Sequence, residues 1–506
     1  MKRIISLASL IAACAVSSCN NADNVQINFA PQAIITTDYL GNGVQWSAYP
    51  HAATVNDEWG ALMTDQKWEM NFQRLDYMQP KLFRVLDQAN WRYLVGFDSA
   101  GKPILNFDND EVRAQRRILD YAQRNNITVL LGEWGTPFKV HDTKAGHSDK
   151  FNGADDPLWL DAIVEYLDFL IIQNGYTCIK YFNLVNEPNG DWSTVNGDFD
   201  NWAKGVRLLS EKIKARGLDK YISIAGPDAV TRYDHPTSKY KGGEWVEQAA
   251  KQLDDITGIY EVHDYTDYEL VRTGGFEAFH SDVASHVKPT GKQIIFGELG
   301  FARGSEANQA RVKADGFSSE DSQMDVYDYS YGVDMADAQI QSMLAGYSGS
   351  AAWALDDAMH TLNDEGDPKQ LKRWGMWNSL GEELCNNPKD TEMRPWYYAW
   401  SILCRYIPTG STIHRLDMPT IKGLRAVATT TDGGATIAIV NNATTPQRIS
   451  LNGFEGTFKR FDYIDGARTV DADGFPTPSA TGLDSKALGS VEIAANSLVM
   501  FTNYQH

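Results

Sequence analysis

The chain has 506 residues, of which 43% are hydrophobic and 22% are charged, as in an ordinary globular protein. This length exceeds what one small core organises and predicts two domains, one of them large enough to be a barrel. The 46 basic and 66 acidic residues give a net charge of −20. This charge argues against nucleic acid and anionic membrane surfaces as partners, because both require a basic patch.

The first 19 residues, MKRIISLASLIAACAVSSC, start with two basic residues, continue as an apolar run and end in small residues before Cys19. The run is too short to span a bilayer and predicts a secretion signal. Residues 16–19, VSSC, resemble a bacterial lipobox. This resemblance implies that residues 1–18 are a lipoprotein signal peptide and that Cys19 is lipidated, which would anchor the exported protein in the periplasm or at the cell surface. The alternative is an ordinary signal with an incidental Cys19.

From residue 40 onward, short apolar or β-branched runs end in polar or aromatic clusters and alternate with helical stretches. Such runs predict parallel strands that are covered on both faces. Eight of them occur: NGVQWSAY (42–49), LFRVLDQ (82–88), ITVLLGEWG (127–135), TCIKYFNLVNE (177–187), YISIAGPDA (221–229), GIYEVHDYTD (258–267), QIIFGELGF (293–301) and GSAAWALDD (349–357).

Helical candidates between these runs include 110–125, 157–173, 200–216 and 334–347. The second has Pro157 near its start, where helices tolerate proline, and apolar residues at a spacing close to 3.6. Eight strand–helix units fit a (β/α)8 TIM barrel better than an open sheet. We assign residues 19–408 to this barrel.

The last hundred residues change character, because short alternating strands follow one another with turn signals such as TTDGGA and NNATT. This pattern predicts an all-β sandwich over residues 409–506. Residues 25–37 also alternate. They either add a strand to the sandwich or cap the bottom of the barrel.

Polar and aromatic side chains gather at the predicted strand ends, which in a TIM barrel form the active-site face. They are Trp46, Arg84, Glu133, Asn186, Glu187, His263, Tyr265, Glu298 and Trp353. Any one of them would be unremarkable, but packing alone does not explain the whole set. The sequence therefore predicts a binding or catalytic site at this end of the barrel.

Glu187 and Glu298 are the predicted catalytic pair, since each ends a strand, the fourth and the seventh, and both point into one mouth. Glycoside hydrolysis needs two carboxyl groups that flank the scissile bond. One group is a proton donor, and the other attacks the anomeric carbon. Glu133 is the rival carboxylate. It would either contact substrate hydroxyls or pair with Arg84.

NEP at 186–188 on the fourth strand and GELG at 297–300 on the seventh resemble clan A of the retaining glycoside hydrolases, over about residues 40–400. The resemblance implies that Glu187 is the general acid/base and Glu298 the nucleophile. It implies sugar-binding roles for Asn186, toward the 2-hydroxyl, and for Trp353, as a stacking platform. It further implies that Arg84 orients the nucleophile and that His263 and Tyr265 line the catalytic subsite. Further candidates for outer subsites are Trp134, Asn189, Trp192 and Asp228.

Two other functions stay open from the sequence. A degenerate barrel would give a non-catalytic glycan-binding lipoprotein, although such a protein would be expected to lose a glutamate. A metal-dependent hydrolase would need clustered histidines and carboxylates, and the chain offers only isolated histidines and the group Asp356, Asp357 and His360. We expect a carbohydrate substrate and neither metal nor cofactor. Cys178 is expected in the core, and a Cys385–Cys404 disulfide is left undecided.

Overall fold

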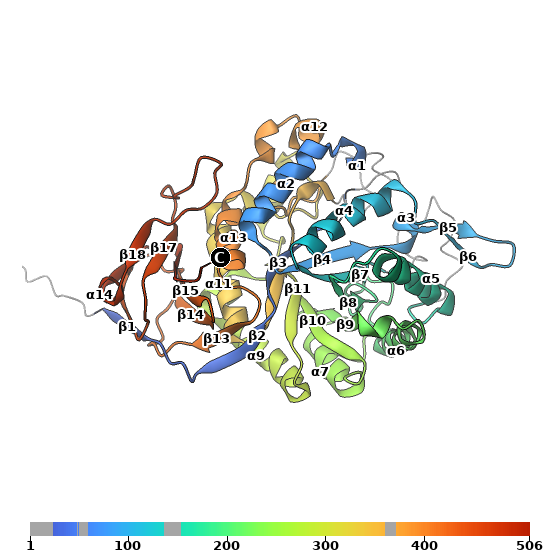
Figure 1. Ribbon diagram of the computed structural model, residues 1–506, viewed down its shortest axis with the longest axis horizontal. Coiled ribbons are helices and arrows are strands. Elements are labelled where there is room, and N and C mark those ends of the chain that lie inside the picture. Colours follow the sequence, from blue (N-terminus) through green and yellow to red (C-terminus); the bar gives the residue numbers. More distant parts are fainter. Residues whose placement is uncertain (1–23, 48, 50–58, 136–152, 360–370, 506) are drawn as a thin grey trace, which may run out of the picture.

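The structure is a computed structural model, and it describes residues 24–47, 49, 59–135, 153–359 and 371–505. The predicted signal peptide, Cys19 and His360 lie outside the described residues. Figure 1 shows two parts of the molecule, a barrel surrounded by helices and a layered β-domain that contains the end of the chain.

The larger part is a closed barrel of eight parallel strands that follow chain order. The eight predicted runs each supply one strand, so the predicted TIM barrel is confirmed. The strands are β3 (Gly41–Gln45), β4 (Leu82–Asp87), β7 (Thr128–Glu133), β8 (Ile179–Asn183), β9 (Ser223–Val230), β10 (Thr257–Thr266), β11 (Ile294–Phe301) and β12 (Gly349–Ala352).

One layer of small and branched side chains fills the lower barrel interior. It consists of Leu40, Leu82, Leu130, Ala225, Ile259, Ile295 and Ala351, with Tyr181 packed against it. Because side chains alternate between the two faces of a strand, this layer identifies which later residues of each strand point inward. On β4 these are Arg84 and Leu86, and on β10 they are Glu261, His263 and Tyr265.

Helices cover the outside of the barrel, and the four predicted helical stretches are confirmed. These are α4 (Asp110–Arg124), α5 (Pro157–Asp168) with its continuation Phe169–Gln173, α6 (Phe199–Ala215) and α11 (Tyr329–Leu344). The start of α5 follows from sequence, because Asp156 caps it by accepting a 2.9 Å hydrogen bond from the Leu158 amide and Pro157 occupies the first turn. The other barrel helices are α1 (Trp59–Leu62), α2 (Asp65–Met78), α3 (Ala89–Arg92), α7 (Gly242–Gln252), α8 (Tyr268–Thr273), α9 (Gly275–Val287), α10 (Glu306–Ala314), α12 (Gly381–Cys385) and α13 (Pro395–Arg405). A small hairpin, β5 (Leu94–Phe97) and β6 (Pro103–Leu105), follows α3.

The smaller part is a sandwich of a seven-stranded and a three-stranded sheet, which confirms the predicted β-domain. The larger sheet has the order β18 (Ala480–Leu483), β17 (Phe458–Tyr463), β20 (Ser497–Thr502), β15 (Gly434–Asn441), β14 (Leu424–Thr431), β13 (Ser411–Arg415), β2 (Ile34–Tyr39). The smaller sheet has the order β1 (Val25–Asn28), β16 (Gln447–Asn452), β19 (Val491–Ile493), and the short helix α14 (Ser485–Leu488) precedes β19. The N-terminal segment thus pairs with both sheets, since β1 runs parallel to β16 and β2 antiparallel to β13.

Helix α11 joins the two parts. Tyr329 and Tyr463 each donate their hydroxyl to the other's backbone carbonyl at 2.8 Å, and the buried Asp337 of α11 pairs with Arg425 of β14. Within the described ranges, no helix combines the length and the apolar character that crossing a bilayer requires. The three cysteines of the described part, Cys178, Cys385 and Cys404, are buried and free. The disulfide left open by the sequence is therefore absent.

Candidate active site

Arg84 forms the floor of the barrel mouth. It lies on β4, is almost completely buried, and reaches three other strands or strand ends. Its guanidinium donates to the Glu298 carboxylate, to Asn186 Oδ1 at 2.7 Å and to both oxygens of Asp228 at 3.1 Å. Burial alone would lower the pKa of Arg84, but the charges of Asp228 and Glu298 outweigh it and raise the pKa. The planar fork of arginine suits such a multidentate contact, and lysine could not reproduce it.

Glu187 lies just beyond the end of β8, on a backbone that bends sharply. Its φ of +47° places it in the left-handed region, which is uncommon for residues other than glycine. The bend is held because the Glu187 amide donates to Asp228 Oδ2 at 3.3 Å and the Gly190 amide donates to the Glu187 carbonyl at 2.9 Å. Such backbone outliers cluster at functional sites. Here the bend turns the Glu187 side chain into the mouth.

Glu298 lies opposite, on β11, and is 3% exposed. It accepts hydrogen bonds from Arg84 and from the hydroxyl of Tyr265. Burial raises the pKa of Glu298, as does the nearby charge of Glu187, while His263, Arg84 and Tyr265 act in the opposite direction and offset this only in part.

The separation of the two glutamates decides what they can do together. Oxygens of Glu187 and Glu298 and a ring nitrogen of His263 all lie within 4.8 Å of one another. Retaining glycosidases place their carboxyl groups about 5–5.5 Å apart, whereas inverting enzymes need about 6.5–9.5 Å to admit a water molecule. The two carboxylates therefore approach each other more closely than an inverting pair requires.

His263 connects this pair to a second layer of acids below it. Its Nδ1 lies 2.9 Å from Glu187 Oε1 and 3.5 Å from Glu298 Oε2, and its Nε2 lies 2.8 Å from Asp228 Oδ1 and 3.1 Å from Glu261 Oε1. Burial would lower the pKa of His263, but the negative charges of Asp228 and Glu298 raise it well above its usual range. The surrounding negative charges thus favour the cationic form of the imidazole between the two layers.

The two lower carboxyl groups have opposite protonation tendencies. Burial acts to raise the pKa of Asp228, but Arg84 and His263 dominate and hold it well below its usual range. Burial and the charge of Asp228 raise the pKa of Glu261 to about 8. The surroundings therefore favour the ionised form of Asp228 and the protonated form of Glu261. This assignment gives the site one anion fewer to balance against Arg84 and His263.

These side chains also form two groups that could hold a metal ion, Glu187–His263–Glu298 and Asp228–Glu261–His263. In both groups a carboxylate already contacts the buried guanidinium, Glu298 in the first and Asp228 in the second. Since Arg84 supplies positive charge where a cation would, the donor set fits an ion-pair network better than a metal centre.

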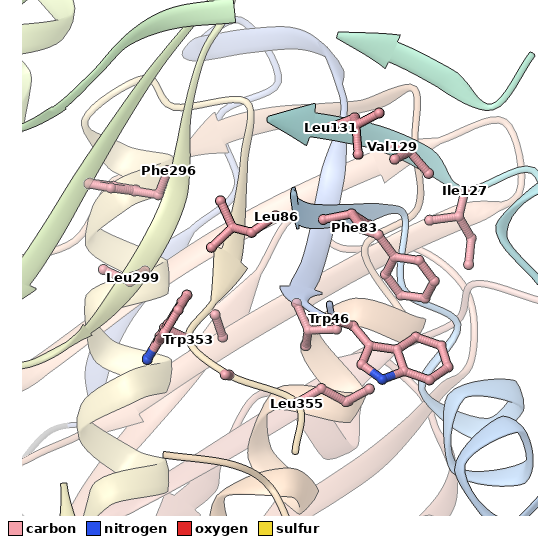
Figure 2. Close-up of a cluster of buried hydrophobic side chains, with 14 of the residues drawn as sticks. Trp46, Phe83, Leu86, Ile127, Val129, Leu131, Phe296, Leu299, Trp353 and Leu355 are labelled. Carbon is pink, nitrogen blue, oxygen red and sulfur yellow. The ribbon is translucent and has the colours of Figure 1, made fainter. Parts of the chain in front are cut away.

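Two tryptophans follow barrel strands near the site, and Trp192 contacts Glu187 directly. Trp353 follows β12 at the mouth and is 5% exposed, and Figure 2 shows its ring near Leu299, apart from Trp46. Trp192 is 53% exposed, donates from Nε1 to Glu187 Oε2 at 2.6 Å, and packs against Tyr233 with 4.6 Å between ring centroids. Trp192 thus combines contact with the predicted acid and an open aromatic surface.

The structure corrects the expectation for Trp46. Its side chain faces outward from the barrel and is fully buried against Trp68, Phe72 and Phe83, with ring centroids 5.7–6.1 Å away. Its Nε1 donates to the Tyr49 hydroxyl at 3.3 Å. Figure 2 shows the ring beside Phe83 in the apolar cluster. Trp46 is therefore a core residue and has no open face for a sugar.

Glu133 also differs from its predicted roles. Leu130 points into the barrel, so alternation along β7 turns Glu133 outward. There it accepts from the Tyr93 hydroxyl at 2.5 Å and from the Ala89 amide at 3.0 Å. Burial and the charge of Asp87 raise the pKa of Glu133 to about 8. The Glu133 side chain thus supports the chain after β4 and does not pair with Arg84.

Other candidates have structural partners. Asn189 bridges to the backbone of Val230 through hydrogen bonds of 2.9 and 3.0 Å. Asp356 accepts from Tyr49 and Ser379, and Asp357 from Arg394. Asp228, expected at an outer subsite, instead lies under the catalytic pair.

Two residues of the site, Glu261 and Trp374, are not among those that the sequence predicts. The Trp374 ring packs edge-on against Tyr265 at 5.2 Å, and no sequence signal placed it there. Glu261 could have been found, because the alternation in YEVHDY puts it on the same face as His263 and Tyr265.

The family model for cellulase, glycosyl hydrolase family 5, matches residues 38–331 of the chain. None of the curated protein sequences compared with the chain matches it.

Solved structures with the same fold span almost the whole chain. A xylanase of glycoside hydrolase family 30, subfamily 8, from Clostridium acetobutylicum has a TM-score of 0.58 at 13% identity, over 95% of this chain and 99% of its own. A family 39 β-xylosidase from Caulobacter crescentus has a TM-score of 0.58 at 14% identity, over 94% and 99%. A family 51 α-L-arabinofuranosidase from Bifidobacterium longum has a TM-score of 0.61 at 13% identity, over 95% and 99%. At these identities the likeness shows a shared fold.

Proposed function

The chain belongs to the cellulase family, glycosyl hydrolase family 5, and we propose that it hydrolyses β-glycosides with retention of configuration. The observation that carries this proposal is the approach of Glu187 and Glu298 to within 4.8 Å at the mouth of the barrel. The substrate is a glycan or oligosaccharide. Xylanase and xylosidase activities are named for two structural neighbours, so xylose-containing substrates belong in the first tests.

In the first step Glu298 attacks the anomeric carbon, and Glu187 gives a proton to the departing glycosidic oxygen. The products are a covalent glycosyl-enzyme and a free alcohol. Arg84 and Tyr265 hold the attacking carboxylate in place by their hydrogen bonds. Asn186, fixed by Arg84, is positioned to contact the sugar 2-hydroxyl, a hydrogen bond that strengthens in the transition state.

In the second step Glu187 takes a proton from water, which attacks the same carbon and releases Glu298. His263 faces both carboxylates, so its cationic ring offsets negative charge on Glu298 before attack and on Glu187 after proton transfer. The exposed face of Trp192, beside Glu187, lies where the leaving sugar would stack.

The test uses aryl β-glycosides and polysaccharides with wild type, Glu298→Ala and Glu187→Ala. Wild type should cleave members of the panel, and both variants should lose activity by several orders of magnitude. Azide should restore the activity of both variants. The product should be a glycosyl azide of inverted configuration with Glu298→Ala and of retained configuration with Glu187→Ala. Glycan binding without cleavage by wild type would favour the non-catalytic alternative. Products longer than the substrate would indicate transglycosylation, which uses the same residues.

We also propose that residues 1–18 are a lipoprotein signal peptide and that lipidated Cys19 anchors the protein to a bacterial membrane, facing the periplasm or the outside. The support is the sequence of this segment alone. Mass spectrometry of the N-terminal peptide from membrane fractions should find a diacylglyceryl Cys19. A Cys19→Ala variant that stays in the membrane fraction would contradict the proposal.

A further inference from the structure

Two neighbouring amide side chains after β4 are buried without hydrogen-bond partners. Across the described residues, Gln88 and Asn90 are the two side chains of which both the buried amide oxygen and the buried nitrogen lack a partner. The indole Nε1 of Trp91, the next residue, is unpartnered as well. A buried polar atom left unpaired costs about 1–3 kcal/mol, so native proteins keep few of them and each needs an explanation.

Alternation along β4 directs the fully buried side chain of Gln88 toward the inside of the barrel. Leu82 lies in the interior layer and Arg84 reaches Glu298, so even-numbered positions of β4 face inward. Asp87 faces outward, where it accepts from Gln115 of α4 at 3.0 Å. Gln88 is still extended, with φ −154° and ψ 125°, so the alternation continues and turns it inward. It lies about 13 Å along the strand from Arg84, at roughly 3.3 Å per residue.

Hydrogen bonds fix the backbone of residues 88–92. The Ala89 amide donates to Glu133, Arg92 donates to Asp87 Oδ1 at 2.7 Å, and the Gln88 carbonyl accepts from the amides of Trp91 and Arg92. Gln88 precedes α3 but makes no capping hydrogen bond with its side chain. The side-chain amide of Gln88 therefore makes no hydrogen bond that stabilises the fold, although the backbone fixes its position.

We propose that Gln88 and Asn90, with the Trp91 indole, form a subsite for a neutral sugar unit beyond the catalytic glutamates, at the end of β4. The unpartnered atoms are three nitrogen donors and two oxygen acceptors. Sugar hydroxyls both donate and accept and so match this mixture, whereas a carboxylate only accepts. The inference rests on the proposed function and assigns a further specificity region to the same mouth, in the segment that directly follows the strand of Arg84.

Thermal unfolding, measured without substrate, tests whether the side-chain amides of Gln88 and Asn90 are unpaired in the folded protein. Gln88→Met and Asn90→Leu should leave the unfolding midpoint unchanged or raise it. The matched controls are Gln115→Met and Asn71→Leu, because both native amides are buried and bonded through oxygen and nitrogen. These controls should lower the midpoint. If Gln88→Met and Asn90→Leu lower it as much as their controls do, both amides have partners within the protein, and the proposal is overturned.

A kinetic comparison tests the sugar contact. The probes are an aryl β-glycoside with one sugar and four neutral tetrasaccharides, xylotetraose, cellotetraose, mannotetraose and gentiotetraose. On the tetrasaccharide that wild type cleaves, Gln88→Met and Asn90→Leu should each raise KM about tenfold, the effect of one or two lost hydrogen bonds, with kinetics on the aryl glycoside retained. In a Glu298→Ala background, the same changes should weaken tetrasaccharide binding in calorimetry.

The outcomes separate this proposal from the proposed function. If wild type cleaves none of the probes, the proposed function fails, and the stability comparison alone decides on the subsite. If wild type is active and Gln88→Met and Asn90→Leu leave KM for every tetrasaccharide unchanged, the subsite is wrong and the function stands. If Gln88→Met and Asn90→Leu lower kcat/KM equally on the aryl glycoside and on the tetrasaccharide, the substitutions disturb the catalytic residues themselves. That result would also overturn the subsite.

Discussion

His263 and Asp228 form the contact that joins the catalytic pair to the acids beneath it, with His263 Nε2 2.8 Å from Asp228 Oδ1. The opposite ring nitrogen of His263 faces Glu187 and Glu298. Asp228 also bonds Arg84, Asn183 and the amide of Glu187. One buried carboxylate therefore orients the groups around both proposed catalytic residues.

Replacing Asp228 should damage folding and catalysis together. Asp228→Asn removes the charge that balances Arg84 and His263, and breaking a buried ion pair costs about 3–5 kcal/mol. We expect that loss in urea unfolding and a fall in kcat/KM of about 100-fold or more. The control is Asp255→Asn, because Asp255 pairs with Arg207 at the surface, where such pairs contribute about 1 kcal/mol or less. Equal effects of the two substitutions would contradict the role given to Asp228.

Removing the Tyr265 hydroxyl should affect the nucleophile with little change in folding. Tyr265→Phe deletes the hydrogen bond to Glu298, and loss of one such donor costs about 10²–10³ in kcat. That hydrogen bond lowers the pKa of Glu298, so its loss should move the acidic limb of the kcat/KM profile to higher pH. Tyr268→Phe breaks a similar bond, to Asp325 at 2.9 Å, that involves neither proposed catalytic glutamate. The control Tyr268→Phe should leave the pH profile of kcat/KM unchanged. If both variants shift the acidic limb equally, Tyr265 has no specific role beside Glu298.

The pH dependence of stability should reveal Glu133. Its folded-state pKa of about 8 exceeds the ordinary value of 4.5, so the folded protein retains a proton that the unfolded chain releases. The stability contributed by the neutral carboxyl is complete below pH 4.5 and is lost as the pH rises to about 8. Glu133→Gln stays neutral, and its amide oxygen can accept from the Ala89 amide while its nitrogen donates to the Tyr93 hydroxyl. The free energy of unfolding of this variant should therefore decline less over this window.

Urea unfolding at half-unit intervals from pH 4.5 to 8 provides the measurement. Glu165→Gln, at a half-exposed site, should follow the wild-type curve. Some decline should remain in Glu133→Gln, because Glu261 has a raised pKa of about 8 as well. A Glu133→Gln curve parallel to wild type would show that Glu133 is already ionised at neutral pH.

The barrel was predictable from sequence because each strand is a continuous apolar run, and the ends of eight such strands meet at one face. The positions of Arg84, Glu187, His263, Tyr265 and Glu298 follow from that architecture together with motif order. Trp46 and Glu133 were misplaced because a shift of one residue along a strand moves a side chain to the other face. Locating the end of a strand in the sequence does not show which residues of that strand face inward.

The second layer required the structure for a different reason. The contacts that Asp228 makes depend on its left-handed backbone, with φ +61°. A pattern of apolar residues does not indicate such a backbone conformation. Trp374 reaches Tyr265 from a segment that follows the last barrel strand by about twenty residues, and such a contact depends on the path of a loop. The unpaired amides of Gln88 and Asn90 became visible only once every neighbouring donor and acceptor had a position.

Two tryptophans with opposite environments provide a final test of the site. Trp192→Ala removes an exposed ring and its hydrogen bond to Glu187, so kcat/KM on oligosaccharides should fall about tenfold or more with little loss of stability. Trp46→Phe leaves a cavity among packed rings and should lower stability by about 1–3 kcal/mol while KM stays near the wild-type value. Thermal unfolding and initial rates on the same preparations distinguish the two. If the effects were reversed, with Trp46→Phe weakening substrate binding and Trp192→Ala neutral, the sugar would bind on the β3 side of the mouth, and the placement of the leaving group beside Trp192 would be wrong.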